Sequence, residues 1–169
     1  MKTNIQNFNL KNSLYRPCVG IMLFNKDGLV FLGKRNDVTP ASWQMPQGGI
    51  DHNENPKTAA LRELKEETGI ETVEVIDFMK EWLFYDYPST LINRNFSKYY
   101  KGQQQLWFAM RFVGSEDEIN LGTTYAEFSE WKWSKLDCIV PLVVDFKRPV
   151  YEELVKKYTY LTTKTSIQF

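Results

Sequence analysis

Hydrophobic residues form short runs that predict a β-hairpin near the start of the chain. The run Val19–Phe24 is continuously apolar, which is typical of a strand buried on both faces. A turn at Asp27-Gly28 separates it from a second apolar run, Leu29–Leu32. Two such runs joined by an Asp-Gly turn predict an antiparallel hairpin. Residues 36–55 are rich in proline and glycine and are expected to form a loop.

The segment after this loop carries the start and stop signals of a helix over 56–68. Pro56 suits the first helical position, where a missing N–H group costs no hydrogen bond. Asn55 precedes it and can cap the free backbone N–H groups with its side-chain oxygen. Gly69 can adopt the left-handed conformation that ends many helices.

The remaining pattern indicates more strands and a second helix. Strand-rich segments are expected at 72–85, 99–113 and 128–134. Pro141 is expected to open a short helical piece, and a last helix should cover about 147–158, where apolar residues recur every three or four positions. The order of hairpin, helix, strands and helix predicts one α+β domain. The expected divisions are a loose lead-in at 1–14, a domain at 15–158 and a C-terminal tail at 159–169.

Composition narrows the classes of function. The chain has 21 Lys and Arg residues against 21 Asp and Glu, which argues against a broad basic surface for DNA or membranes but leaves room for a small phosphate site. No apolar run approaches the roughly 20 residues of a membrane span. Cys18 and Cys138 are expected to be reduced thiols and small core residues of a cytoplasmic protein. His52 is the only histidine, so the chemistry must rest mainly on carboxylates.

Three carboxylates share one face of the first predicted helix. Glu63 and Glu67 are four residues apart, so they differ by about 40° in azimuth and roughly 6 Å in height. Glu66 joins the same face. Their mutual repulsion is relieved by a hard divalent cation such as Mg²⁺, which prefers oxygen ligands. Taken alone, however, such a run is common on a solvated helix surface.

The wider segment 48–70 resembles the Nudix signature, Gly-x5-Glu-x7-Arg-Glu-U-x-Glu-Glu-x-Gly-U, in which U is aliphatic. Every defined position is filled, by Gly48, Glu54, Arg62, Glu63, Leu64, Glu66, Glu67, Gly69 and Ile70. Average residue usage makes chance agreement at all nine positions about one in a billion per starting point. The resemblance therefore outweighs the interpretation as a solvated surface.

This resemblance implies the Nudix fold, an α/β/α sandwich in which a mixed β-sheet lies between helices and the signature forms a loop–helix–loop. It implies hydrolysis of a nucleoside diphosphate linked to another group, with Mg²⁺ or Mn²⁺ as cofactor. By family analogy, the metal is held by Glu63, Glu66, Glu67 and the carbonyl of Gly48. Glu54 and Arg62 would brace the signature loop as outer partners of these ligands.

Flanking motifs resemble the Nudix branch that acts on RNA 5′ ends and dinucleoside polyphosphates. The matching segments are Tyr15-Arg16-Pro17, Trp43-Gln44-Met45-Pro46-Gln47-Gly48-Gly49, Gly102-Gln103-x-Gln105-x-Trp107-Phe108, Glu127-Phe128-x-x-Trp131-x-Trp133 and Phe146-Lys147-Arg148. The branch resemblance makes Glu127 a further metal ligand or the base that acts on water. We do not choose between Glu127 and Glu66 as that base, so the predicted catalytic set is Glu63, Glu66, Glu67 and Glu127.

One predicted substrate contact, Phe146, comes from the same resemblance, and the others are proposed from the chemistry of their side chains. Phe146 is expected to stack on a nucleobase, although it could instead be a helix-cap residue flanked by solvated charges. Tyr85 is expected to touch phosphate or base, with an ordinary exposed strand aromatic as the alternative. The cations expected to meet phosphates, unless they are solvated strand ends, are Arg16, Lys34 and Arg35. The tryptophans of the flanking motifs are expected in the core, and His52 is expected to be exposed and non-catalytic.

The expected function is pyrophosphohydrolysis of a polyphosphate carried by a 5′-nucleoside. The expected partners are 5′-triphosphorylated RNA and diadenosine tetraphosphate, and the chain is expected to be a monomer. Two alternatives stay open at this point. One is a Nudix enzyme for ADP-ribose or a damaged nucleotide, and the other is a non-catalytic nucleotide sensor or RNA-decay partner on the same scaffold.

Overall fold

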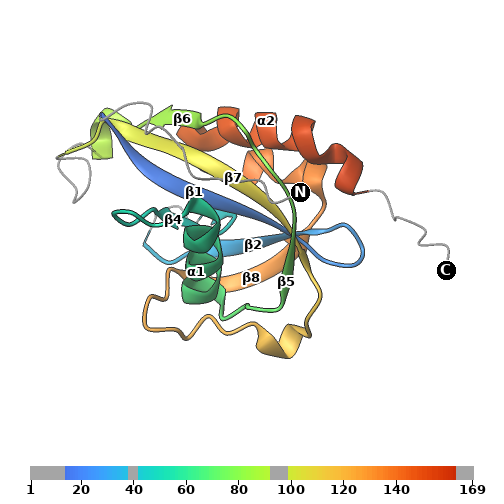
Figure 1. The fold of residues 1–169 in the computed structure, drawn as a ribbon. Coiled ribbons are helices and arrows are strands. Elements are labelled where there is room, and N and C mark those ends of the chain that lie inside the picture. Colours follow the sequence, from blue (N-terminus) through green and yellow to red (C-terminus); the bar gives the residue numbers. More distant parts are fainter. Residues whose placement is uncertain (1–13, 38–41, 92–98, 163–169) are drawn as a thin grey trace.

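A computed structural model describes residues 14–37, 42–91 and 99–162, so most of the predicted lead-in and the chain beyond Thr162 lie outside these ranges. The described strands are β1 (Tyr15–Phe24), β2 (Val30–Arg35), β3 (Trp43–Gln44), β4 (Gln47–Gly49), β5 (Val73–Phe78), β6 (Leu83–Asp86), β7 (Gly102–Phe112) and β8 (Phe128–Ser134). The α-helices in these ranges are α1 (Pro56–Thr68) and α2 (Arg148–Tyr158), which lie on opposite sides of the sheet (Figure 1).

Strand β1 is the centre of a mixed sheet. It pairs with β7 in parallel along its whole length, from Tyr15 opposite Gly102 to Phe24 opposite Arg111. On its far side, β7 pairs antiparallel with β5 and β6. Strand β2 pairs antiparallel with β1 at the predicted hairpin and also with β3 and β8. The expected α/β/α sandwich with a mixed sheet is therefore confirmed.

Two hydrophobic cores, one on each face of the sheet, explain why the first strand is continuously apolar. Met22 and Phe24 pack into the core under α2, and Ile21 and Leu23 pack into the core under α1. All four side chains are fully buried. Alternate residues of a strand point to opposite faces of the sheet. In a strand that is covered on both faces, every position is therefore buried and favours an apolar residue.

Helix α1 begins and ends where its sequence signals predict. The Asn55 side chain accepts a hydrogen bond of 2.9 Å from the backbone N–H of Lys57, and Pro56 occupies the first turn. Gly69 has a φ of 74°, and its N–H group donates to the carbonyl of Lys65. The apolar residues that seat the helix on the sheet are Ala59, Ala60 and Leu64.

The expectation of a continuous loop over 36–55 is wrong, because β3 and β4 lie within it. Strand β4 pairs antiparallel with β1, with Cys18 opposite Gly49. Strands of two and three residues carry too few positions for an alternating pattern, and their pairing partners are distant in sequence. The strand-rich segment 72–85 is also divided, into β5 and β6.

Individual burial assignments differ in places from the sequence expectations. Cys18 is buried but Cys138 is exposed, so the expectation that both are core residues is wrong for Cys138. Leu161, in a short 3-10 turn, packs into the core under α2, so ordered packing continues past the predicted domain boundary at residue 158. The α-helices of the described ranges are too short or too polar to cross a membrane.

Candidate active site

The signature loop is bound to α1 through the guanidinium of Arg62. This group donates to both carboxylate oxygens of Glu54, at 2.8 and 2.7 Å, and to the carbonyl of Gly49 at 2.8 Å. It also donates to Glu63 at 2.8 Å and to Glu66 at 3.2 Å. The Arg62 guanidinium lowers the pKa of the Glu54 carboxyl. Glu54 and Arg62 therefore lie where they were predicted to brace the loop, because the Arg62 guanidinium contacts both the loop and the carboxylates of the helix.

Glycine at position 48 lets the Glu63 carboxylate approach the backbone closely. A Cβ atom at Gly48 would lie 1.9 Å from the carboxyl carbon of Glu63, so any larger residue at position 48 would force this carboxylate to move. Burial raises the pKa of Glu63, and the nearby carboxylates of Glu66 and Glu127 raise it further against the opposing effect of Arg62. The close contact places the Glu63 carboxylate beside the backbone of Gly48, whose carbonyl is predicted by family analogy to bind the metal.

Glu67 is the most deeply buried of the signature carboxylates, with 2% of its surface exposed. One oxygen accepts a hydrogen bond of 3.1 Å from the backbone N–H of Gln47. Among the described residues, the other oxygen, Oε1, has no hydrogen-bond partner. Burial and the neighbouring Glu127 carboxylate raise the pKa of Glu67 well above its usual range. A buried carboxylate oxygen without a partner is costly unless a cation binds it.

The residues present fit a hard divalent cation in their chemistry. The groups that would bind it are all oxygens, and the buried Oε1 of Glu67, which has no partner among the described residues, is suited to contact a cation. Within the ranges that the structure describes, no three His, Cys, Asp or Glu side chains are already arranged to hold a metal ion. Arg62 pairs with two of the carboxylates, Glu63 and Glu66, so a cation would compete with it for them.

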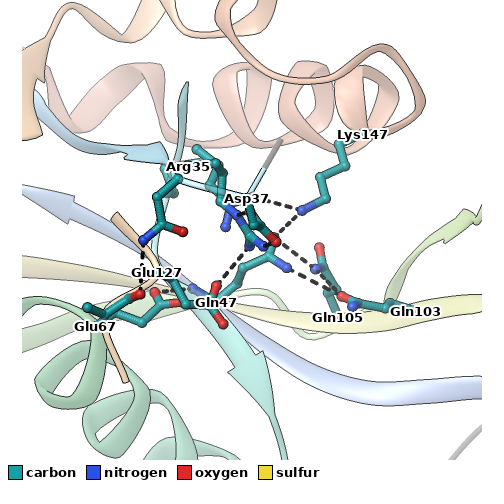
Figure 2. Close-up of polar contacts among 12 residues, drawn as sticks. Arg35, Asp37, Gln47, Glu67, Gln103, Gln105, Glu127 and Lys147 are labelled. Atoms are coloured by element: carbon teal, nitrogen blue, oxygen red, sulfur yellow. Dashed lines mark hydrogen bonds and ion pairs between the residues drawn. The ribbon is translucent and has the colours of Figure 1, made fainter. Parts of the chain in front are cut away.

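Glu127 immediately precedes β8 and is held by the end of β2. Arg35 donates to Glu127 at 2.8 Å and also pairs with Asp37 (Figure 2). The backbone N–H of Asn36 donates to the Glu127 carbonyl at 3.2 Å. Arg35, which the sequence assigns to substrate phosphates, is therefore bound to two carboxylates, and its contact with phosphate stays a prediction.

The loop that carries Glu127 is fastened to the C-terminal end of α1. The N–H group of Asn120 donates to the Thr68 carbonyl at 2.8 Å, and the Thr123 hydroxyl donates to the Glu66 carbonyl. These bonds use helix carbonyls that lack partners within the helix. They bring residue 127 to the signature helix although the two are far apart in sequence.

Sequence reasoning missed the environment of Lys147. This side chain is 7% exposed and donates to Gln44 at 2.9 Å and to Gln47 at 3.2 Å. It points from the start of α2 toward Gln47, while Glu67 approaches the same glutamine from α1 (Figure 2). Burial, helped by the positive charge of Arg35, lowers the pKa of Lys147 to about 8. The alternative of a solvated charge beside Phe146 is wrong for Lys147, and its only sequence signal was the Phe-Lys-Arg motif.

A chain of glutamines extends this network along the sheet. Gln105 donates to Gln47 at 3.4 Å and to Gln103 at 3.0 Å, and it accepts from the indole N–H of Trp107 at 3.1 Å. These residues form a buried polar floor next to Lys147. Amide groups both donate and accept hydrogen bonds. These glutamines can therefore rearrange their hydrogen bonds when those of Lys147 change.

The other predicted substrate contacts occupy different environments. Arg16 lies against Gly49, where an added Cβ would come within 2.4 Å of its guanidinium. Lys34 pairs with Glu130 on the sheet surface. Phe146 is half-buried, and its ring centre lies 5.4 Å from that of Tyr85. Tyr85 is 6% exposed, so the alternative of an exposed strand aromatic is wrong, and its contact with substrate stays a prediction.

Of the remaining sequence expectations, His52 is exposed, as predicted. Trp107 is fully buried, whereas Trp43, Trp131 and Trp133 are half-buried at the margins of the two cores. The prediction that all four tryptophans lie in the core is therefore confirmed for Trp107 and only partly for the other three.

Comparison with known proteins identifies similar chains over almost all of the described structure. A model of the NUDIX domain matches residues 14–154. A protein of Cereibacter sphaeroides named RNA pyrophosphohydrolase is 51% identical over 146 residues, covering 85% of this chain and 90% of the relative. A protein of the same name from Zymomonas mobilis is 46% identical over 152 residues, covering 89% and 98% of the two chains.

Solved structures share the fold at lower sequence identity. The E. coli dihydroneopterin triphosphate pyrophosphohydrolase aligns with a TM-score of 0.66 and 21% identity, covering 85% of this chain and 99% of the other. The binary complex of a C. elegans Ap4A hydrolase aligns with a TM-score of 0.61 and 18% identity, covering 85% and 96%. At these identities the likeness extends to the fold alone.

Proposed function

Because the chain belongs to the Nudix family of hydrolases, we propose that it is a pyrophosphohydrolase that converts 5′-triphosphorylated RNA to 5′-monophosphorylated RNA. The observation that carries this proposal is the 51% identity, over 85% of the chain, with a relative named RNA pyrophosphohydrolase. Diadenosine tetraphosphate also presents a polyphosphate on a 5′-nucleoside. We therefore propose it as a second substrate of the same site, cleaved to ATP and AMP.

The two alternatives from the sequence have less support. A non-catalytic sensor is disfavoured because every carboxylate of the signature is present and lies at the site. An enzyme for ADP-ribose or a damaged nucleotide is disfavoured by the flanking motifs, including Phe146-Lys147-Arg148. The free thiols of the described ranges fit a reducing compartment, and we propose a cytoplasmic monomer.

Nudix hydrolases generally need a divalent cation, and we propose Mg²⁺, with Mn²⁺ as a substitute. The residues that would hold it are Gly48, through its carbonyl, and the carboxylates of Glu63, Glu66, Glu67 and Glu127. When bound, the cation supplies positive charge that stabilises the phosphoryl oxygens as the phosphate bond breaks. Glu54 and Arg62 fix the loop on which these ligands depend.

The protein's own groups would perform the remaining steps. Glu127 or Glu66 would take the proton from the attacking water, since both carboxylates are partly exposed and next to the buried ligands. Arg16 lies beside the signature loop and is suited to hold phosphate oxygens. The buried amine of Lys147 is suited to the same task, because burial strengthens its interaction with any anion that enters.

The function is tested by phosphate release from a short triphosphorylated RNA, with diadenosine tetraphosphate in competition at equal concentration. We expect release to require a divalent cation, to stop with a chelator and to return with Mg²⁺ or Mn²⁺. We also expect a higher kcat/KM for RNA. A higher kcat/KM for the dinucleotide would reverse the order of substrates, and recovery with Zn²⁺ alone would contradict an oxygen-ligand site.

Phe146 is expected to contribute both to substrate binding and to stability. Stacking on a base is worth about 1–3 kcal/mol, so Phe146→Ala should lower kcat/KM roughly 5- to 150-fold for RNA and dinucleotide alike. Because the ring is half-buried against Tyr85, the melting temperature should also fall by a few degrees. Phe146→Leu retains apolar packing without an aromatic face, so it should restore the melting temperature but not kcat/KM. Full recovery of kcat/KM by leucine would show that Phe146 only packs.

A further inference from the structure

Asp37 lies outside the signature and the flanking motifs, yet it engages Arg35 along one whole edge of the guanidinium. The Nε atom of Arg35 donates to Oδ1 of Asp37 at 2.7 Å, and Nη2 donates to Oδ2 at 2.5 Å. We propose that Asp37 is a positioning residue, which occupies this edge and thereby commits Arg35 to holding Glu127 rather than a substrate phosphate. This inference rests on the proposed role of Glu127 in the reaction.

The geometry of a guanidinium makes this assignment specific. Its donors form a rigid planar fork, so two parallel hydrogen bonds along one edge fix the orientation of the whole plane. With Asp37 on the Nε–Nη2 edge, the remaining nitrogen, Nη1, donates to Oε2 of Glu127 at 2.8 Å. The same edge is one that a phosphate would use for two-point binding, and here it is already occupied.

Glu127 needs such a hold because its neighbour repels it. The Glu127 carboxylate lies beside that of the buried Glu67 (Figure 2), and two like charges at close range repel each other. The Glu127 side chain is 45% exposed and could turn toward solvent to escape it. Arg35, only 18% exposed, opposes this movement with a charge that Asp37 keeps in place.

Asn36, between Arg35 and Asp37, is hydrogen-bonded to the backbone on either side of the Ala126–Glu127 link, so the 35–37 segment holds Glu127 through more than one residue. The Asn36 side chain donates to the Ala126 carbonyl at 3.1 Å, and the Asn36 N–H donates to the Glu127 carbonyl at 3.2 Å. The pairing of β2 with β8 shifts register between Lys34 and Arg35. Such an irregularity re-aims a side chain, and here the side chain beyond it is the one that reaches Glu127.

The decisive measurement is the separation of kcat from KM in Asp37→Asn. Asparagine has nearly the same size as aspartate, but an NH₂ donor replaces one of the two acceptor oxygens. The guanidinium can therefore no longer make two parallel hydrogen bonds to this side chain. We expect kcat to fall about 10-fold, as for other outer partners of catalytic ligands, with KM changed less than twofold. Asp37→Glu should restore part of the loss. If Asp37 only kept Arg35 from binding phosphate and had no effect on Glu127, its removal would lower KM and leave kcat unchanged, and that result would overturn the positioning role.

A matched control comes from another exposed ion pair. Glu71 pairs with Lys65 at 3.0 Å, and its side chain is 61% exposed against 57% for Asp37. Glu71→Gln removes the same kind of charge from α1's C-terminal side, and we expect kcat and KM to stay at wild-type values. A loss equal to that of Asp37→Asn would attribute the effect to general surface charge and overturn the proposal.

A double-mutant cycle separates this inference from the proposed function. In a Glu127→Gln background, Asp37→Asn should cause no further loss of kcat, because both changes act on one contact. Binding of Mn²⁺ to the metal-free proteins, followed by electron paramagnetic resonance, gives a readout that needs no substrate. Asp37→Asn should weaken it several-fold, while Glu71→Gln should not.

The outcomes distinguish a failure of the proposed role of Glu127 from a failure of the positioning role of Asp37. Wild-type turnover in Glu127→Gln would refute the proposed role of Glu127, whatever Asp37→Asn does. Loss of turnover in Glu127→Gln, together with additive effects in the cycle or unchanged Mn²⁺ binding in Asp37→Asn, would overturn the positioning role alone.

Discussion

Replacing Glu67 with glutamine is expected to remove at least ~99% of turnover while leaving the protein as stable as before or more so. Activity falls because a neutral amide cannot supply the charge that a divalent cation needs. Stability does not fall because the carboxylate is 2% exposed, with one oxygen unpartnered among the described residues. Burying an amide costs less than burying a carboxylate beside another negative charge.

The expectation for Glu67→Gln is checked by melting temperature in metal-free buffer and by kcat with saturating Mg²⁺, on the same preparation. The amide oxygen can still accept from the Gln47 N–H group, and its nitrogen can donate toward Glu127. The exposed Glu71→Gln variant serves as the control for loss of a charge. A melting temperature lower by more than about 5 °C would show that Glu67 supports the fold. More than half of wild-type turnover would refute its assignment as a metal ligand.

Replacing Gly48 with alanine is expected to lower kcat about 100-fold, although the substitution adds only one carbon atom. That carbon would lie 1.9 Å from the carboxyl carbon of Glu63, so the carboxylate must move away. The backbone itself accepts alanine, because Gly48 is not among the described glycines with positive φ. The melting temperature should therefore change little, since the Glu63 side chain can shift toward solvent.

Gly122→Ala is the matched control for Gly48→Ala. Position 122 also lacks a positive φ, and among the residues that the structure describes an added Cβ there would meet only the Asn120 side chain, at 3.2 Å. We expect wild-type kinetics from it. The two variants are compared by kcat as a function of Mg²⁺ concentration, where displacement of a ligand should raise the concentration needed for half-maximal rate. Identical Mg²⁺ curves for Gly48→Ala and the wild type would contradict the role of this contact.

The parts of the site that could be predicted from sequence are those determined by neighbours along the chain. Helix α1 has its capping residues adjacent to it, and its carboxylates share a face because of helical spacing alone. The continuous apolar run of β1 likewise follows from burial on both faces. For these features, local propensity and the final fold agree.

The parts that could not be predicted depend on distant pairing. Lys147 precedes a helix with other charges nearby, which resembles a solvated helix start. It is nevertheless buried, and its hydrogen-bond partners Gln44 and Gln47 are distant in sequence. Arg35 is a cation at a strand end, and its contact with Glu127 requires β8 to pair with β2. Apart from the Phe-Lys-Arg motif at Lys147, no local pattern in the sequence indicates either contact.

The parallel pairing of β1 with β7 also determines when the site can come into existence during folding. Its register joins Tyr15 to Gly102, so the chain must close a long loop before the central strands can meet. Helix α1 lies inside that loop and carries its own caps, so it can form early. Glu127 and Lys147 both follow β7 in the chain, so the site is complete only after this strand and the segments beyond it are in place. A nascent chain therefore displays its acidic helix well before it can hydrolyse anything, and refolding should restore helical signal before it restores catalysis.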